Sequence, residues 1–247
     1  MSAGLYVDCQ NSHINLNPEI LQTKVQLAIQ STAFREIPDK IARMNPDIKA
    51  IVFDFGGVLL DWDPRYLYRR YFSDQPQAMD QFLAEVNFYE WNAKQDQGRP
   101  FTEGIAELSN QFPHHSQLIQ TYYDRWEESI NGPIQGSIEI LHQLKQKGYP
   151  LFGLSNWSAE TYPRALRKYS FFNMFDDVVL SGAVKLNKPD PAIFRLLLNK
   201  IGYRAPECLL IDDSKANIES AKELGFVTIH FKSPEELKTE LQMLNLL

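Results

Sequence analysis

The chain has 247 residues, of which 44% are hydrophobic and 23% are charged. This composition is that of an ordinary globular protein, and the length allows one large domain or a core domain with a smaller one. The net charge of −6 argues against a nucleic-acid-binding or anionic-membrane-binding surface. No long apolar run predicts a membrane helix and no basic-then-apolar start predicts a secretion signal, so we expect a cytoplasmic protein.

The first 49 residues differ from the rest of the chain. They begin with a polar stretch rich in Asn and Gln, contain no strand pattern, and show only weak amphipathic periodicity over residues 18–44. We expect residues 1–49 to form an N-terminal extension that is poorly ordered or loosely docked. A helix that binds a partner is the alternative.

Strand and helix signals alternate from residue 50 onward. Short apolar runs occur at 50–53, 151–154, 178–180, 209–211 and 227–231. Helix signals lie between these runs: an apolar stripe over 138–144 that Gly148 ends, an N-cap with a first-turn proline at Asp190-Pro191, and a capping box over 233–236. This alternation predicts an α/β fold, a Rossmann-like parallel sheet with helices on both faces.

Residues 64–135 interrupt the alternation. Their pattern is helical and rich in aromatic residues, and no comparable strand run occurs among them. We therefore expect a small α-helical cap domain over 64–135, inserted after the first strand, with 50–63 and 136–247 forming the core. Most of the aromatic side chains should form the core of the cap, and one or two of them should line a substrate pocket.

Polar residues stand where three of the predicted strands end: Asp54, Ser155 and the pair Asp212-Asp213. Parallel strands of an open sheet present their carboxyl ends at one edge, where ligands bind. The glycines that follow Asp54 permit a tight turn and a close approach of ligand to backbone. A carboxylate in that position can coordinate a hard cation or attack an electrophile.

Other polar residues near these strand ends suit an anionic ligand. Ser155 and Asn156 offer a hydroxyl and amides, and we expect them close to a helix N-terminus, where phosphate oxygens bind well. Lys188 precedes a proline-stiffened loop and can direct its charge towards phosphate or towards a carboxylate. Adjacent carboxylates such as Asp212 and Asp213 are costly without a cation. Taken singly, Ser155 could be a helix cap and Lys188 a solvated loop charge.

In combination these motifs are more specific. The chain contains, in order, Phe53-Asp54-Phe55-Gly56-Gly57-Val58-Leu59, then Leu154-Ser155-Asn156, then Lys188-Pro189-Asp190-Pro191, then Ile211-Asp212-Asp213-Ser214 with Asn217. This order resembles the four motifs of the haloacid-dehalogenase superfamily, from about residue 48 to the C-terminus. The inserted helical segment resembles its C1 cap. The pattern is most similar to subfamily IA, variant 3, which includes bacterial glucose-1-phosphate-type phosphatases.

The resemblance implies a phosphomonoester hydrolase that acts on a small phosphometabolite, with a sugar phosphate favoured. Asp54 would attack phosphorus and form an aspartyl-phosphate that water hydrolyses. The resemblance implies a Mg²⁺ site formed by Asp54, the Gly56 carbonyl, Asp213 and Asp212, with Asp213 the better candidate of the pair. It implies that phosphate is bound by Ser155, Asn156, Gly57 and Lys188, and that Lys188 also offsets the charge around Asp54.

One position departs from the family pattern. Most phosphatases of the superfamily carry a second Asp two residues after the nucleophile as general acid and base, and this chain has Gly56 there. General acid catalysis contributes about 10² to 10⁴ in rate, so we expect a preference for good leaving groups. Asp61 and Asp63 could substitute for the missing acid, or they could cap the helix that begins at Pro64 and brace the cap hinge.

Two alternative functions follow from this departure. The metal-independent 2-haloacid dehalogenases of the superfamily also lack the second Asp, since halide leaves without a proton, and they would use Asp54 as nucleophile. They usually have neutral residues in the fourth motif, so Asp212-Asp213 favours the phosphatase. The second alternative is a catalytically weak protein that binds a phosphometabolite or a protein partner.

Arg99, in the predicted cap, could contact a substrate anion or be a surface loop charge.

Overall fold

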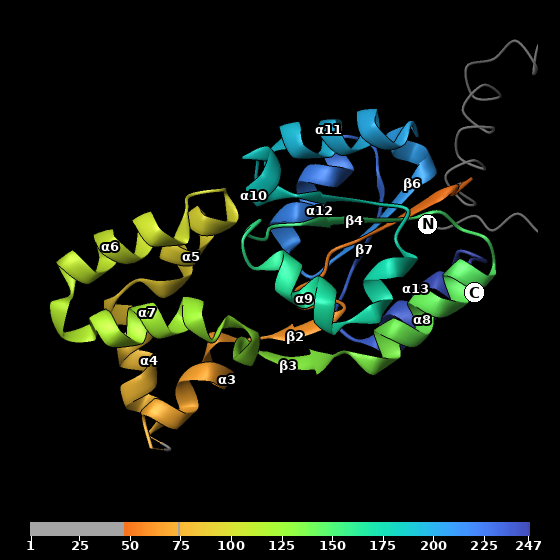
Figure 1. Cartoon of the computed structure of the whole chain (residues 1–247). Helices are drawn as coiled ribbons and strands as arrows, with labels where there is room; N and C mark the ends of the chain where they lie inside the picture. Colours follow the sequence, from red (N-terminus) through yellow and green to blue (C-terminus); the bar gives the residue numbers. More distant parts are fainter. Residues whose placement is uncertain (1–46, 74) are drawn as a thin grey trace, which may run out of the picture. The chain divides into compact units, whose positions relative to one another are not determined.

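The computed structural model describes residues 47–73 and 75–247, so most of the predicted N-terminal extension lies outside the described residues (Figure 1). Residues 47–49 already belong to the folded unit. Ile48 is buried, and the Lys49 amide donates a hydrogen bond to the Glu207 carbonyl (2.8 Å). None of the described helices is long and apolar enough to span a membrane.

A five-stranded parallel sheet has the strand order β5-β4-β1-β6-β7. The strands are β1 (Ala50–Phe53), β4 (Leu151–Ser155), β5 (Asp177–Leu180), β6 (Cys208–Asp212) and β7 (Val227–His230). Each boundary lies within one residue of the predicted run. The α/β fold expected from the sequence is confirmed.

Helices cover both faces of the sheet because buried side chains alternate along the strands. Ala50 and Val52 belong to one apolar cluster and Ile51 and Phe53 to the other. The first cluster includes residues of α11 (Pro191–Ile201) and α12 (Lys215–Glu223), and the second includes residues of α8 (Gln135–Gln146), α9 (Tyr162–Lys168) and α13 (Pro234–Met243). Figure 1 shows these two groups of helices on opposite sides of the sheet.

The residues predicted to cap helices lie at helix ends in the structure. The Asp190 side chain accepts a hydrogen bond from the Ala192 amide (2.8 Å) at the start of α11. The Ser233 hydroxyl accepts one from the Glu236 amide (3.2 Å) at the start of α13, which is half of the predicted capping box. Gly148 follows α8 with a φ of 87°, the left-handed conformation of a helix end.

A group of helices lies between β1 and β4 in the chain. It comprises α3 (Pro64–Tyr68), α4 (Pro76–Glu85), α5 (Phe88–Asp96), α6 (Phe101–Gln111) and α7 (Ser116–Asp124). We call residues 64–124 the helical segment. Its core is aromatic: the Tyr122 ring contacts Phe88, with ring centres 4.8 Å apart, and it also contacts Tyr68, Trp91 and Phe101.

The expectation that residues 64–135 contain no strand is wrong. β3 (Ile130–Pro133) pairs antiparallel with β2 (Leu60–Trp62), and this two-stranded ribbon joins the helical segment to the sheet (Figure 1). β3 escapes sequence analysis because it has only four residues, two of which, Gly132 and Pro133, are rare in strands.

Gly153 in β4 has no room for a side chain. An added Cβ would lie 2.2 Å from Cζ of Phe55, whose ring packs against Trp157 and Phe172 and has little space to move. We expect Gly153→Ala to lower the free energy of unfolding by about 1 to 3 kcal/mol through overpacking, measured by denaturant titration. Gly56→Ala is the control, because its Cβ would meet nothing within 4 Å. Equal stabilities of the two variants would contradict this packing.

Candidate functional site

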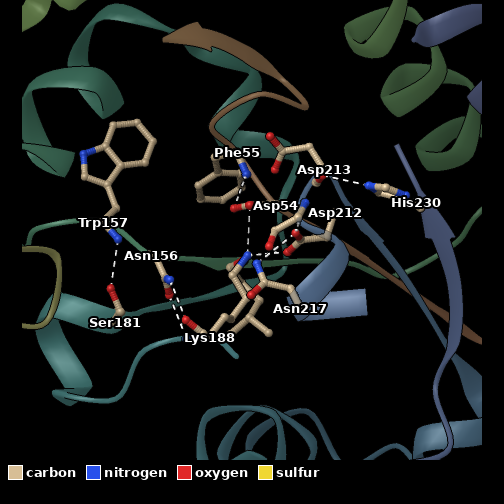
Figure 2. Close-up of polar contacts among 12 residues, drawn as sticks. Asp54, Phe55, Asn156, Trp157, Ser181, Lys188, Asp212, Asp213, Asn217 and His230 are labelled. Atoms are coloured by element: carbon tan, nitrogen blue, oxygen red, sulfur yellow. Dashed lines mark hydrogen bonds and ion pairs between the residues drawn. The ribbon is translucent and has the colours of Figure 1, made fainter. Parts of the chain in front are cut away.

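Three carboxylates meet at the carboxyl ends of β1 and β6, which are neighbours in the sheet. Asp54, Asp212 and Asp213 each offer an oxygen atom within 4.8 Å of those of the other two. Asp54 is 8% exposed and Asp212 is fully buried. The structure therefore brings together the acidic residues that the sequence singled out (Figure 2).

The ammonium of Lys188 lies between two of these carboxylates. Its side chain is fully buried, with Nζ 3.0 Å from Oδ2 of Asp54 and 2.6 Å from Oδ2 of Asp212. Nζ also donates to the Leu154 carbonyl (2.7 Å). An ammonium has three N–H groups, so acceptors within the protein already engage all of them. This arrangement favours charge compensation at Asp54 over direct binding of phosphate.

Two features determine the pKa values in the cluster: burial of its side chains, and the presence of more carboxylates than ammonium groups. Burial raises the pKa of Asp54, and the Lys188 charge opposes this rise only in part. For Lys188, burial would lower the pKa, but the charges of Asp54 and Asp212 outweigh it and the pKa rises. Burial and the neighbouring Asp212 also raise the pKa of Asp213. Three carboxylates face one ammonium, so the site has an excess of negative charge that a cation would offset.

The two acids of the fourth motif have different surroundings. Oδ1 of Asp212 accepts hydrogen bonds from the Ser214 amide and from Nδ2 of Asn217 (both 2.9 Å), while Oδ2 binds Lys188. Asp213 as a residue is exposed, although its carboxyl is partly desolvated. Among the described residues, His230 lies against Asp213, but its Nε2 contacts the backbone carbonyl (2.9 Å) and leaves the carboxylate free. An added Cβ at Gly57 would lie 2.3 Å from Oδ2 of Asp213, so the turn after β1 and Asp213 are in close contact. Asp213 thus has free oxygen ligands of the kind a hard cation prefers.

Ser155 and Asn156 lie next to this cluster, but they do not precede a helix. Ser155 is the buried last residue of β4, and α9 begins only at Tyr162 after a loop. The helix start beside this loop belongs to another part of the chain, because the Trp157 amide donates to Oγ of Ser181 (2.9 Å), the first residue of α10 (Ser181–Val184).

The Asn156 side chain holds the loop that carries Lys188. Its Nδ2 donates to the Lys188 carbonyl (2.9 Å), and its Oδ1 accepts from the Lys188 amide (2.8 Å) (Figure 2). These two hydrogen bonds show that the side chain of Asn156 positions the backbone of Lys188.

Asp61 and Asp63 have structural roles. Asp63 caps α3 by accepting a hydrogen bond from the Arg65 amide (2.8 Å). Asp61 accepts hydrogen bonds from the Tyr66 hydroxyl (2.9 Å) and from Nδ2 of Asn131 (2.9 Å), which ties β2 to β3. Neither acid lines the cavity described below, so the structure gives no support to their replacing the acid missing at Gly56.

Arg99 is also engaged within the helical segment. Its Nε donates to Oε1 of Gln95 (2.6 Å), and its guanidinium forms an ion pair with Glu107. Arg99 does not line the cavity described next, so the structure gives no support to a contact between Arg99 and a substrate anion.

A cavity of about 90 Å³ lies between the strand ends and the helical segment. Gly56, Ser155 and Asn156 line it from the sheet side. Two of the aromatic residues counted with the predicted cap, Tyr122 and Trp126, line it from the other side. A ligand in this cavity would touch the strand-end residues and the helical segment together.

Sequence analysis missed one acidic residue of this cavity, Asp96 at the end of α5. Its Oδ1 accepts from the Ser158 amide (3.0 Å) and its Oδ2 from Nδ2 of Asn92 (2.8 Å). The Ser181 hydroxyl donates to the Asp96 carbonyl. In the sequence, an acid before Gln97-Gly98 resembles any solvent-exposed helix end, so no local signal distinguishes it.

Comparison with known proteins identifies the family of this chain. The family model of haloacid dehalogenase-like hydrolases matches residues 51–231. The chain is 24% identical to a phosphorylated carbohydrates phosphatase of Thermotoga maritima and 26% identical to a phosphoglycolate phosphatase of Aliivibrio fischeri. Each alignment covers 74% of this chain, with 84% and 83% of the relatives. Another relative, the drimenol cyclase drtB of Aspergillus calidoustus, is 22% identical over 78% of this chain, which spans only 36% of that protein.

Solved structures show the same fold. The HAD family enzyme BT-2542 of Bacteroides thetaiotaomicron, in its magnesium complex, superposes with a TM-score of 0.63 at 21% identity, covering 79% of this chain and 99% of that one. The sheet and the helices around it thus have the architecture of this enzyme. The chain belongs to the haloacid dehalogenase-like hydrolase family. The predicted superfamily and enzyme class are confirmed, while the subfamily and the cap type stay predictions.

The Lys188 ion pairs are buried, so the loss of one partner should lower the free energy of unfolding strongly. We expect Lys188→Met to lower the free energy of unfolding by about 3 to 5 kcal/mol, because it leaves Asp54 and Asp212 buried without their counter-charge. Lys200→Met is the matched control, since the Lys200–Asp177 pair (2.6 Å) is exposed and should contribute less than about 1 kcal/mol. Equal losses in calorimetric unfolding would show that the Lys188 cluster is not specially stabilised.

Proposed function

We propose that this protein is a Mg²⁺-dependent phosphomonoester hydrolase that acts on a small phosphometabolite, with a sugar phosphate favoured. The observation that carries the proposal is the position of Asp54 beside Lys188 and the uncommitted carboxylate of Asp213. A dehalogenase that acts on an anionic substrate without metal gains nothing from a third carboxylate. The relatives named as phosphatases of phosphorylated carbohydrates and of phosphoglycolate support the same reaction class.

Asp54 is the proposed nucleophile. Its Oδ1 accepts a hydrogen bond from the Phe55 amide (2.7 Å) and its Oδ2 pairs with Lys188 (3.0 Å), so the carboxylate has a fixed orientation. One of its oxygens forms a bond to phosphorus as the ester P–O bond breaks, and water then hydrolyses the aspartyl-phosphate. Positioning and electrostatic stabilisation supply most of the catalysis in such phosphoryl transfers.

The remaining roles follow from which groups are free. Asp54, Asp213 and the Gly56 carbonyl would hold Mg²⁺, whose charge, when bound, stabilises the phosphate oxygens. Asp212 would hold Lys188 in preference to ligating the metal, because its buried carboxylate already accepts three hydrogen bonds, one of them from Lys188. The Ser155 hydroxyl and the backbone amides near Gly57 and Asn156 would receive the phosphate.

Purified protein should release phosphate from p-nitrophenyl phosphate with Mg²⁺ and lose this activity in EDTA. Asp54→Asn should abolish turnover, because an amide does not attack phosphorus. Asp176→Asn is the control and should retain turnover, because it alters an ion pair with Lys145 that lies outside the strand-end carboxylates. L-2-Chloropropionate is assayed in parallel. Chloride release that survives EDTA would replace the phosphatase by a dehalogenase, and no turnover of either compound would favour a binding protein.

The two acids of the fourth motif should respond differently to substitution. Asp213→Asn should weaken Mg²⁺ binding by more than about tenfold with little loss of stability, because it removes a proposed ligand that has no other partner. Asp212→Asn should chiefly lower stability, because it removes a charge partner of the buried Lys188. Isothermal titration with Mg²⁺ and thermal unfolding separate the two effects. A stronger loss of Mg²⁺ affinity in Asp212→Asn would reverse the proposed assignment.

A further inference from the structure

Asp96 offers the single carboxyl side chain among the described residues that line the cavity. Gly56 and Ser155 line the same cavity from the sheet side. A phosphate ester seated with its phosphate at the strand ends would therefore extend its leaving group towards α5. An acid on α5 would then face the leaving group across the cavity that Gly56 also lines.

The Asp96 carboxyl has a fixed position. It is held by the Ser158 amide from the loop after β4 and by Asn92 from its own helix, and the Ser181 hydroxyl binds its backbone carbonyl. Each carboxyl oxygen accepts only one of these bonds and has capacity for a second interaction. The carboxyl can therefore carry a proton and donate it without breaking these contacts.

A second residue indicates that a polar ligand group belongs in this cavity. The Tyr122 hydroxyl lies fully buried in the cavity wall and has no hydrogen-bond partner among the described residues. The indoles of Trp62 and Trp126 are its polar neighbours, but neither meets the geometry of a hydrogen bond. Buried polar groups in native proteins nearly always have a partner, so we expect an oxygen of the ligand to bind Tyr122.

Asp96 is in a setting that favours its protonated form. Although part of the residue remains accessible, burial of the carboxyl raises its pKa to about 8, and the Ser158 amide opposes this only in part. Tyr122 is the titratable group that faces it, and its pKa stays well above the usual range because of burial and the Asp96 charge. Ser158 and Ser181, on the other elements packed against Asp96, carry no charge.

We propose that Asp96 is the general acid of the reaction and takes the place of the acid absent at Gly56. The inference rests on the proposed phosphatase function. As Asp54 bonds to phosphorus and the ester P–O bond breaks, the Asp96 proton moves to the leaving oxygen, which gives a neutral alcohol and an Asp96 carboxylate. In the second step, that carboxylate takes a proton from the water that attacks the aspartyl-phosphate. The substrate class then includes esters of aliphatic alcohols, contrary to the preference for good leaving groups expected from Gly56.

The test compares two leaving groups in Asp96→Asn with Mg²⁺ present. The kcat/KM for glycerol 1-phosphate should fall by about 10² to 10⁴, while the kcat/KM for p-nitrophenyl phosphate, whose leaving group needs no proton, should be largely retained. The constant kcat/KM is compared because it reports only the steps up to release of the alcohol, whereas kcat also includes the hydrolysis of the aspartyl-phosphate that both esters share. The falling basic limb of the kcat/KM profile near pH 8 should disappear for the alkyl ester. Glu160→Gln is the control, because Glu160 binds the Phe101 amide (2.9 Å) at another contact between sheet and helical segment. It should change neither the leaving-group ratio nor the pH profile.

Equal losses of kcat/KM with the two esters, or no loss with the alkyl ester, would overturn the role of Asp96 as the acid while leaving the phosphatase intact. A wild-type protein that cleaves neither ester would instead reject the proposed phosphatase function, and the general acid with it. The kcat/KM values of the two esters, measured in the wild type and in Asp96→Asn, therefore distinguish these two failures.

Stability provides a readout that does not depend on activity. Because the pKa of Asp96 is higher in the folded than in the unfolded protein, the folded wild type holds a proton that the unfolded chain releases between about pH 4 and pH 8. Wild-type stability should therefore fall relative to Asp96→Asn as the pH rises through this range, and the Tm difference should level off above it. The Asn92 amide can rotate to accept from the new Asn side chain. A Tm difference that does not vary with pH would show that Asp96 is not protonated.

Discussion

The buried ammonium of Lys188 is the interaction on which the rest of the site depends. It separates the carboxylates of Asp54 and Asp212, which would otherwise repel each other at the ends of neighbouring strands. Its third N–H binds the end of β4, and Asn156 anchors its backbone from the same strand end. One side chain therefore ties β1, β4 and β6 together at the edge where a ligand binds, and it fixes the orientation of the proposed nucleophile.

A second constraint is the contact between the helical segment and the sheet. The end of α5 is bound by Ser158 and Ser181, and a Cβ added at Gly98 would lie 2.8 Å from the Gly182 carbonyl, so the two backbones nearly touch. This contact helps to enclose the cavity. The burial that comes with it raises the pKa of the Asp96 carboxyl, which costs stability at neutral pH.

Much of the fold could be predicted from the sequence because the sheet strands are buried on both faces. Runs such as 209–211 are continuously apolar and end abruptly in polar residues, which marks both the strand and its functional end. The β2–β3 ribbon could not be predicted in this way. Its pairing depends on contacts such as that between Asp61 and Asn131, 70 positions apart in the chain, and strands this short leave no periodic pattern.

Some residues of the candidate site could be predicted from the sequence and others could not. Asp54, Lys188 and the Asp212-Asp213 pair could be predicted because each lies in a motif at or just after a strand end. Asp96 could not be predicted, since its burial arises only when α5 packs on the loop after β4. The family resemblance favours Asp213 over Asp212 as the metal ligand, and the observation that supports this prediction, three hydrogen bonds to the carboxylate of Asp212, depends on tertiary structure.

The central claim is that Asp54 attacks phosphorus and becomes covalently phosphorylated. The most direct measurement is rapid acid quenching of the enzyme during turnover of p-nitrophenyl phosphate with Mg²⁺, followed by mass spectrometry of its peptides. The account predicts a phosphoryl group on the peptide that contains Asp54, present during turnover and gone once the substrate is exhausted. Phosphate release at an undiminished rate with that peptide unmodified throughout would contradict the account, because water would then attack the ester directly.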